Sequence, residues 1–296
     1  MSRAREIVTA LRGRMYRSGG LCFCPAHANT KTPALSVMDG REGRLLLHCY
    51  AGCAFSDIMD ALRGLGLVEG QGSYSPPSQA ELAANREAER QEARKRADQA
   101  LRCWNEAGPI SGTPAEVYLR DVRGITAPLP PTMRFHSAAW HGPTAQRLPA
   151  MVALVEGLDL PAVHRTYLAP RGTAKAEVEP NKMMLGTTAG GHVEVAQADG
   201  PMVVAEGIET ARALASGLLA RPATIWAALS TSGMSGLILP DNPGRLAVAT
   251  DGDDAGNQAG KALAMKAKAQ GWQVSLLPAP TGCDWADVLK LKRGAA

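Results

Sequence analysis

The sequence predicts an α/β protein: a doubly wound parallel sheet in residues 201–296, preceded by a mixed α+β region and a small ribbon of strands at the amino terminus. Short apolar runs that alternate with helical stretches predict the sheet, and two tight clusters of cysteine and histidine mark the ribbon. The expected segments are 1–68 for the ribbon domain, 69–108 for a linker and charged helix, 109–200 for the mixed subdomain and 201–296 for the parallel sheet.

The composition is that of a globular protein without a membrane span. Of the 296 residues, 45% are hydrophobic and 20% are charged. No run approaches the roughly 20 apolar residues that a membrane span needs, and residues 1–18 lack the apolar core of a signal peptide. We therefore expect a cytoplasmic protein, in the bacterial cytosol or nucleoid, with no membrane partner. In that reducing compartment, clustered cysteines hold metal more often than they form disulfides.

The amino-terminal segment is helical in pattern and basic in charge. Apolar residues recur at helical spacing and predict a small amphipathic helix: Ala4, Ile7, Val8, Leu11 and Met15. The net charge of the whole chain is only +4, but residues 1–56 carry eight arginines and lysines against three acids. This is a modest basic footprint around the cysteine clusters, of the kind that nucleic-acid partners attract.

The candidate metal ligands form two pairs, one on each side of a predicted hairpin: Cys24, His27, Cys49 and Cys53. Each pair flanks a short turn, so its ligand atoms can point to one position. A Cys3His tetrahedron suits zinc, and a closed shell leaves no position for catalytic water. We therefore predict a zinc ribbon with one structural zinc per chain. Cys22 and His48 could replace an assigned ligand, but a packed thiol and a solvent-facing ring are the favoured interpretations.

The region after the ribbon is predicted to contain a short helix and a linker. Residues 56–67 place four apolar side chains on one side of a helix: Ile58, Met59, Leu62 and Leu65. Residues 68–79 are rich in glycine, serine and proline, which is typical of a linker.

A long charged helix follows the linker. Ser78 and Glu81 match a capping box, which predicts a helix that ends near residue 107. Its middle has almost no large apolar side chain. Such a run is usually a solvated face with ion pairs, and nucleic-acid binding is the less favoured alternative. Leu101 and Trp104 are expected to anchor its end.

The middle of the chain has a mixed pattern. Residues 114–122 predict a helix, and residues 150–168 predict two strands around a turn at 156–159. A further hairpin is expected around residues 189–195.

Carboxylates follow the apolar runs of the last segment. The predicted strands are 201–207, 223–229, 245–251 and 273–280, and helical stretches separate two pairs of them. The acids expected at the strand ends are Glu206, Asp251, Asp253, Asp284 and Asp287. Because the carboxyl ends of parallel strands form one functional edge, these acids should converge there and repel one another unless a cation joins them. Oxygen ligands of this kind suit Mg2+.

Two sets of motifs carry a family resemblance. "VVAEGIETA" and "ATDGDDAG" resemble the motifs of the Toprim fold, found in bacterial primases, topoisomerases and some nucleases. "CPAHANTKTPALSV" and "LLHCYAGC" resemble the zinc-binding domain that precedes Toprim in replicative and phage primases. In this order, over residues 20–66 and about 110–290, the chain resembles a small DNA primase of the bacterial type, as carried by phages and mobile elements.

This resemblance implies a nucleotidyltransferase of the DNA-directed RNA polymerase type. It would make short primers on a single-stranded DNA template from nucleoside triphosphates. Glu206, Asp251 and Asp253 would take the catalytic positions that bind Mg2+ or Mn2+, and Asp284 would be an accessory acid. The carboxylates and their ions would lower the pKa of the attacking 3′-hydroxyl and neutralise the leaving pyrophosphate.

The resemblance also assigns partners and basic residues. Arg165, Lys175 and Lys182 in the mixed subdomain would face the template and the incoming nucleotide. No Gly-x4-Gly-Lys-Ser/Thr loop is present, so we expect a replicative helicase to be a separate chain. The sequence departs from replicative primases in two ways: three residues separate Cys49 from Cys53, where two are usual, and Glu209 follows the first motif where those proteins vary.

Two other functions share these motifs. A non-catalytic recombination or repair mediator also pairs a zinc motif with a Toprim fold, but such proteins typically use four cysteines and need no complete acid set. A Toprim nuclease would share the acids but has no evident need for an amino-terminal ribbon that reads template. DNA primase is the favoured hypothesis.

Overall fold

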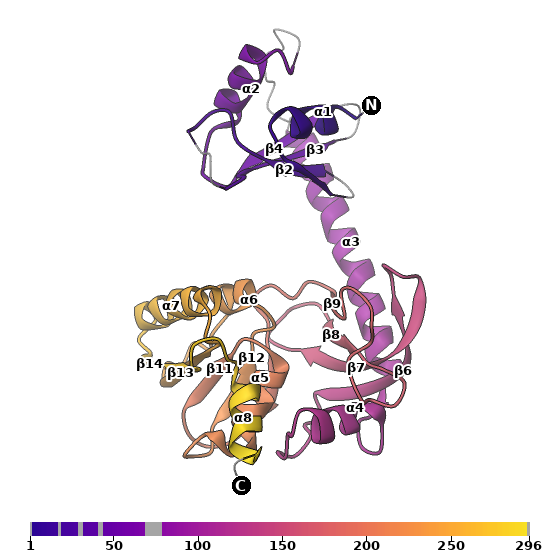
Figure 1. Cartoon of the computed structure of the whole chain (residues 1–296), viewed down its shortest axis with the longest axis vertical. Coiled ribbons are helices and arrows are strands. Elements are labelled where there is room, and N and C mark those ends of the chain that lie inside the picture. The colour runs from indigo at the N-terminus through magenta and orange to yellow at the C-terminus, as the bar shows by residue number, and fades with distance from the viewer. Residues whose placement is uncertain (1, 17–18, 29–31, 41–43, 69–78, 295–296) are drawn as a thin grey trace. The chain divides into compact units, whose positions relative to one another are not determined.

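The computed structural model describes residues 2–16, 19–28, 32–40, 44–68 and 79–294 (Figure 1). The chain divides into two compact units, residues 1–78 and 79–296, and each is described by itself. Nearly all of the predicted linker, 68–79, lies outside the described residues. No helix in the described part is both long enough and apolar enough to cross a membrane.

The first unit is a four-stranded antiparallel sheet with two helices. The strands follow in spatial order: β1 (Arg14–Tyr16), β2 (Gly19–Cys22), β3 (Leu35–Asp39) and β4 (Leu45–Cys49). The predicted hairpin is confirmed, because β3 pairs with β4 from Leu35 opposite Cys49 to Asp39 opposite Leu45. Helix α1 (Arg3–Ala10) buries Ile7 and Val8 in the core beside Leu35, and helix α2 (Phe55–Gly64) follows the last ligand pair.

The amino-terminal helix is shorter than predicted. It ends at Ala10, and Met15, expected on the helix, lies in strand β1. Arg12 adopts a left-handed conformation with φ of 52°, which cannot continue a right-handed helix. Leu65, expected on the apolar side of the second helix, lies one residue beyond the end of α2 and is exposed.

The second unit begins with the long helix α3 (Gln79–Glu106), whose end was predicted correctly. Its charged middle is exposed, as expected of a solvated face. Ser78, the proposed cap, lies outside the described residues. Ala97 and Ala100 make the buried contacts, and Trp104 packs beside them. Leu101 does not anchor the helix, because it points away from this contact and is 43% exposed.

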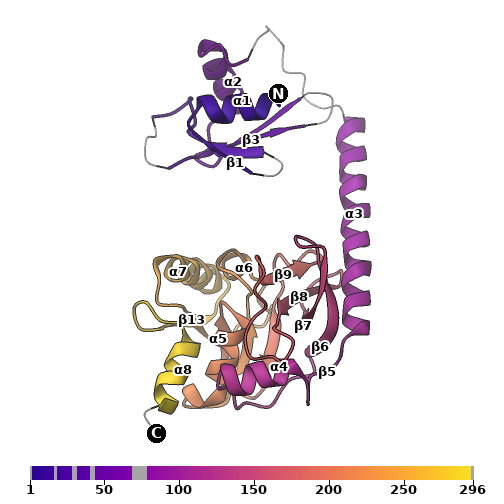
Figure 2. The same ribbon diagram turned by 45° about the vertical axis from the view of Figure 1, so that its right-hand side comes forward.

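An antiparallel sheet packs against the carboxyl-terminal half of α3 (Figure 2). Its strands, in spatial order, are β5 (Gly108–Pro109), β6 (Met133–His141), β7 (Gln146–Val155), β8 (Ala162–Tyr167) and β9 (Lys182–Leu185). Strands β7 and β8 are the predicted pair. The predicted helix is present as α4 (Pro114–Val117) and the π-helical turn η2 (Tyr118–Val122).

The hairpin predicted around residues 189–195 is wrong. Strand β9 pairs with β8, whereas β10 (Val193–Ala196) joins the other sheet and pairs antiparallel with β12. The reason is burial: Val193 and Val195 alternate with partly exposed neighbours, and the core of that second sheet covers them.

The parallel sheet has the order β10-β12-β11-β13-β14, and all pairs except β10·β12 are parallel. Its remaining strands are β11 (Met202–Ala205), β12 (Thr224–Ala227), β13 (Arg245–Thr250) and β14 (Gln273–Pro278). The helices are α5 (Ile208–Ala213) with the π-helical turn η3 (Leu214–Leu218), α6 (Thr231–Gly236), α7 (Asp254–Ala269) and α8 (Trp285–Gly294). The predicted doubly wound sheet is confirmed (Figure 1).

Alternation along the strands explains why both faces of this sheet are covered. Val203 of β11 lies in the core that contains Ile208 of α5 and Leu289 of α8, whereas Val204 lies in the core that contains Met234 of α6 and Leu263 of α7. Successive side chains of a strand point to opposite faces, so a strand that is apolar throughout needs helices on both sides.

Candidate functional site

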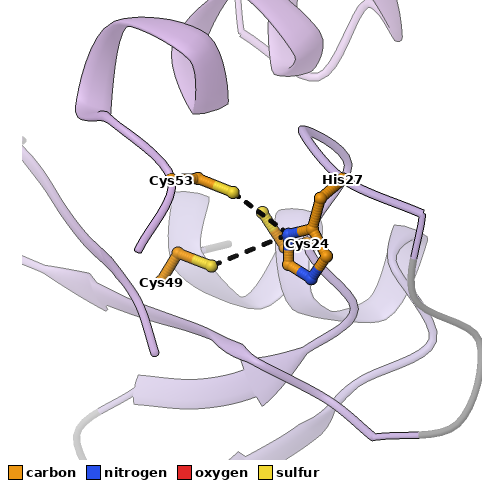
Figure 3. Close-up of side chains that lie close together, drawn as sticks. All are labelled: Cys24, His27, Cys49 and Cys53. Carbon is orange, nitrogen blue, oxygen red and sulfur yellow. Dashed lines mark hydrogen bonds between the residues drawn. The ribbon is translucent and has the colours of Figure 1, made fainter. Parts of the chain in front are cut away.

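The four predicted zinc ligands come together in the first unit (Figure 3). One ligand atom from each of Cys24, His27, Cys49 and Cys53 lies within 4.8 Å of all the others. His27 Nδ1 points into the group, 3.1 Å from Cys53 Sγ and 3.8 Å from Cys49 Sγ. The Cys3His cluster therefore fits a structural zinc ion.

The scaffold around these ligands explains their convergence. Cys49 is the last residue of β4, and Cys24 lies two residues beyond the end of β2. The register places Cys22 and Cys49 on either side of Leu35 in β3, so β2 and β4 end at the same edge of the sheet. Burial raises the pKa of the Cys24 thiol to about 12, and the neighbouring thiols add to it. A buried thiolate of this kind needs a cation beside it, and zinc supplies that charge.

The two spare neighbours take the expected structural roles. Cys22 is buried, and its thiol donates to the carbonyl oxygen of Leu35 at 3.5 Å. His48 lies on the exposed face of β4, with its ring edge-on to Tyr50 at a centroid distance of 4.9 Å. Neither belongs to the Cys3His group.

The second candidate site lies at the carboxyl edge of the parallel sheet. Glu206 directly follows β11 and Asp251 directly follows β13, and these strands are paired with Ala205 opposite Ala249. Burial, together with the charges of Asp251 and Asp253, raises the pKa of Glu206 to about 7. Burial likewise raises the pKa of Asp251 to about 6, with Asp284 and Asp253 contributing. The four predicted acids are therefore electrostatic neighbours.

These carboxylates are gathered less tightly than the zinc ligands. Among the described residues, the Cys3His set is the one group of three or more potential ligands that converges closely enough to hold an ion. Asp251 Oδ1 is nevertheless buried without a hydrogen-bond partner. An orphaned carboxylate oxygen among like charges suits a hard cation, and Mg2+ usually keeps several waters and shares itself with substrate phosphates. The chemistry of these oxygen donors suits a divalent ion, but the acids are not gathered into a closed ligand set in this structure.

Helix caps hold three of the acids. Asp253 caps α7, and its Oδ1 accepts a hydrogen bond from the Gly256 amide at 2.7 Å. Asp284 and Asp287 form a reciprocal cap on α8: Asp284 Oδ1 accepts from the Asp287 amide at 2.8 Å, and Asp287 Oδ2 accepts from the Asp284 amide at 3.3 Å. Asp287 is thus turned toward its own helix end, and Asp284 is the acid that approaches Asp251.

A tight turn brings the last acid to the others. The Gly252 amide donates to the carbonyl oxygen of Cys283 at 2.8 Å, and the Gly282 amide donates to the carbonyl oxygen of Gly252 at 2.9 Å. A Cβ atom on Gly252 would lie far inside van der Waals contact of the Pro280 carbonyl oxygen. The glycine between Asp251 and Asp253 therefore lets two loops approach closely enough to join their carboxylates.

Two of the three predicted basic residues lie beside this edge. Lys182 of β9 pairs with Glu209 of α5, and its charge also acts on the carboxylates of Glu206 and Asp251. Lys175 Nζ lies 3.2 Å from Glu209 Oε1. A pocket of about 690 Å³ opens next to Lys175 and is also lined by Tyr118 and Arg123.

Arg165 lies elsewhere. It is 6% exposed, and its guanidinium donates to the carbonyl oxygens of Trp140 at 2.9 Å and Met184 at 3.4 Å. These bonds hold strands of the antiparallel sheet together. The structure does not bring Arg165 together with the two lysines, so the proposed site does not include Arg165.

Sequence reasoning missed Glu209 as a structural centre. It was noted only as a departure from the primase pattern, yet its carboxylate is 6% exposed and bonds to Tyr118, Arg123, Lys175 and Lys182. The only sequence signal was its place three residues after Glu206. Its partners Tyr118 and Arg123 lie 91 and 86 residues away in the chain, where no local pattern points to them.

Two family descriptions match parts of the chain. Residues 201–296 match the Toprim domain, and residues 94–195 match a domain of unknown function, DUF7146. The first match agrees with the observed sheet and confirms the predicted Toprim fold. Comparison with curated protein sequences gives no match.

The chain is also similar to solved primase structures at low identity. The zinc-binding and RNA polymerase domains of the Aquifex aeolicus primase share 14% identity, with 99% of this chain and 82% of that one covered and a TM-score of 0.41. The RNA polymerase domain of the Mycobacterium tuberculosis primase DnaG shares 17%, covering 69% and 80%, with a TM-score of 0.41. A DNA primase domain from Pseudomonas aeruginosa shares 17% over 53% of this chain, with a TM-score of 0.33, and the match spans 52% of that structure.

Proposed function

We propose that this chain is a DNA primase that makes short primers on single-stranded DNA by metal-dependent nucleotidyl transfer. The observation that carries the proposal is the edge of the Toprim sheet, where Glu206, Asp251 and Asp253 are electrostatic neighbours with Lys182 beside them. A cytoplasmic location, a phage or mobile-element type of primase, nucleoside triphosphate substrates and a separate replicative helicase belong to the same proposal.

The residues of the edge divide the chemistry between them. Mg2+ or Mn2+, held by Glu206, Asp251 and Asp253 with Asp284 as accessory acid, would lower the pKa of the primer 3′-hydroxyl and neutralise charge on the leaving pyrophosphate. Lys182 has two ammonium hydrogens beyond the one it gives to Glu209, and these can bond phosphate oxygens. Caps on α7 and α8 keep the backbone of the acidic loops in place while substrate binds.

The open face of the ribbon sheet is suited to single-stranded template. Strand registers place two rows of side chains on the face opposite α1: Tyr16, Gly19, Met38 and Leu46 in one row, and Arg14, Leu21, Ser36 and His48 in the other. Tyr16 is 60% exposed, and Tyr50 beyond the end of β4 is 70% exposed. Exposed rings next to arginine offer base stacking worth about 1–3 kcal/mol per base. We assign template binding to this face.

Primer synthesis by the purified chain tests the proposal. The zinc-loaded protein is incubated with single-stranded DNA, labelled nucleotides and Mg2+ or Mn2+, and short new oligomers are expected. Glu206→Gln should lower their rate of formation about a hundred- to a thousandfold, because one charge contact to the transition state is lost. Glu106→Gln, which changes an acid on α3 away from the edge, is the matched control and should keep full activity.

Two other outcomes would contradict the proposal and favour a different function. Shortening of the template that depends on Glu206 would identify a nuclease. Template binding that is undiminished in Glu206→Gln, Asp251→Asn and Asp253→Asn, with no nucleotide incorporated by any variant or by the unaltered chain, would favour the recombination mediator.

A further inference from the structure

Glu209 gathers side chains from η2, from β9 and from the segments that follow η2 and precede β9. The hydroxyl of Tyr118, in η2, donates to Glu209 Oε1 at 2.7 Å, and the guanidinium of Arg123 lies 3.4 Å from the same oxygen. Lys175 reaches that oxygen at 3.2 Å, and Lys182 of β9 pairs with Oε2. The antiparallel sheet and its helices are therefore tied to the first turn of α5 through one carboxylate.

The charges in this group do not balance. Three cations surround one carboxylate, so the group has a surplus of positive charge. Burial alone would raise the pKa of Glu209, but Lys182 and Lys175 hold that pKa well below its usual range. Glu209 is therefore held in its ionised form at neutral pH.

The ion pair places Lys182 near other carboxylates, because its partner Glu209 follows Glu206 by three residues on the turn from β11 into α5. Glu206 and Asp251, the proposed metal ligands, both interact with it, and its charge opposes the effect of burial on each. Lys182 is partly exposed and ends in a flexible four-carbon chain. Without Glu209, the ammonium group would be free to pair with Glu206 and Asp251 and to occupy the position of a divalent cation.

We propose that Glu209 is a positioning residue that holds the Lys182 ammonium group beside the carboxylates of Glu206 and Asp251 and off them, so that these carboxylates remain free to bind a divalent cation. The inference rests on the proposed function, because that function assigns the cation to these acids. Glu209 thus decides whether Lys182 assists the metal site or competes with it.

A merely structural Glu209 makes a different prediction. If Glu209 only neutralises the cations and joins two sheets, its loss would weaken cation binding through the change in charge alone, and by the same factor whether Lys182 is present or absent. If Glu209 restrains Lys182, then removal of Lys182 should cancel most of the damage. A double-mutant cycle separates the two, because it measures the coupling between these residues.

The test measures Mn2+ binding to the zinc-loaded full chain by electron paramagnetic resonance at pH 8, in the absence of nucleotide. Glu209→Gln should weaken Mn2+ binding about tenfold, since a competing ammonium charge close to a carboxylate is worth about that much. Lys182→Met should bind Mn2+ at least as tightly as the unaltered chain. The double variant should return to within about threefold of Lys182→Met. Glu106→Gln is the control and should be unchanged.

Each outcome decides between the proposals. Unchanged Mn2+ affinity in Glu209→Gln would overturn the inference. So would a double variant that is weaker than Lys182→Met by the same factor that separates Glu209→Gln from the unaltered chain. If Glu206→Gln releases the Mn2+ in the same assay, the metal assignment survives that failure; if Glu206→Gln binds as the unaltered chain does, both proposals fall together. Should Glu209→Gln melt below the assay temperature, Glu209→Asp keeps the charge but withdraws it by one methylene, and a smaller loss, again cancelled by Lys182→Met, is expected.

Discussion

The Cys3His cluster and the acidic edge of the Toprim sheet both bring together groups that repel one another when ionised, yet they are built in opposite ways. In the ribbon, four ligand atoms lie within 4.8 Å of each other. At the sheet edge, Asp253 and Asp284 accept hydrogen bonds from backbone amides at the starts of α7 and α8. Glu206 and Asp251 interact with one another only through their charges. The first arrangement fits a closed four-ligand zinc site, whereas the acids of the second are not gathered around one position.

This contrast is the one expected between a structural metal site and the catalytic metal site that we propose for the sheet edge. A structural site draws its ligands together because the metal contributes folding energy directly. A catalytic site must keep like charges near each other while the ion is absent, so it needs rigid turns and neighbouring cations such as Lys182.

The largest effect is expected in the ribbon. Cys49→Ser should lose zinc, and the first unit should unfold with it, because structural zinc sites contribute on the order of 10–16 kcal/mol of binding free energy to folding. Elemental analysis and amide hydrogen exchange over residues 19–64 measure both losses. Cys103→Ser, on α3, should keep one zinc per chain. Full zinc occupancy in Cys49→Ser would contradict the assignment of Cys49 as a zinc ligand, since the tight cluster would then need no thiolate at that position.

The tight turn at the acidic edge comes next. Gly252→Ala places a Cβ against the Pro280 carbonyl oxygen, so the two loops must separate, at a cost of about 1–3 kcal/mol in the free energy of unfolding. The separation should also weaken Mn2+ binding, because Asp251 and Asp284 move apart. Gly236→Ala is the control, because nothing lies within 4 Å of its added Cβ. Equal stability of both variants in urea would show that the turn is not what joins the acids.

A smaller effect is expected from pH. The pKa values of Glu206, about 7, and Asp251, about 6, lie above the ordinary values of 4.5 and 3.8. The folded metal-free protein therefore favours the protonated acids, so this contribution to stability is complete below pH 4 and is lost as pH rises through 6 and 7. Because solvent screens these half-buried carboxylates, we expect the free energy of unfolding to fall by only roughly 1 kcal/mol between pH 5.5 and 8. This loss corresponds to about 3 °C in the melting temperature of the second unit.

Two additions sharpen the pH measurement. Added Mg2+ should reverse the loss at pH 8, where both acids are ionised, and should do little at pH 5.5. Glu206→Gln should make the melting temperature depend less on pH, because the acid with the higher pKa no longer titrates. A melting temperature that rises from pH 5.5 to 8 without Mg2+ would contradict the raised pKa values.

The smallest effect is expected on the charged helix, outside both sites. Arg96 and Glu92 are 3.2 Å apart on α3, but their side chains are 61% and 55% exposed. Arg96→Ala should change the unfolding free energy by no more than about 0.5 kcal/mol, because exposed i,i+4 pairs contribute little. Its affinity for single-stranded DNA should stay within about twofold by fluorescence anisotropy. A larger fall would support the alternative interpretation, in which this helix binds nucleic acid.

Local patterns in the sequence were sufficient for the parts of this protein that depend on neighbours in the chain. The spacing of Cys24 to His27 and Cys49 to Cys53 on either side of a hairpin predicted one convergent cluster, because a hairpin returns its ends to the same place. The alternation of apolar runs with helices predicted the parallel sheet, and the rule that parallel strands share a carboxyl edge placed Glu206 beside Asp251.

Tertiary structure alone decided features that depend on distant segments. Strand β10 had no local mark that assigns it to one sheet or the other, because pairing partners are chosen by packing. Arg165 and Lys182 were alike in the sequence, yet one is buried among carbonyl oxygens and the other lies beside the acids. The role of Glu209 depends on partners up to 91 residues away, and burial in the folded chain is what makes its charge interactions strong.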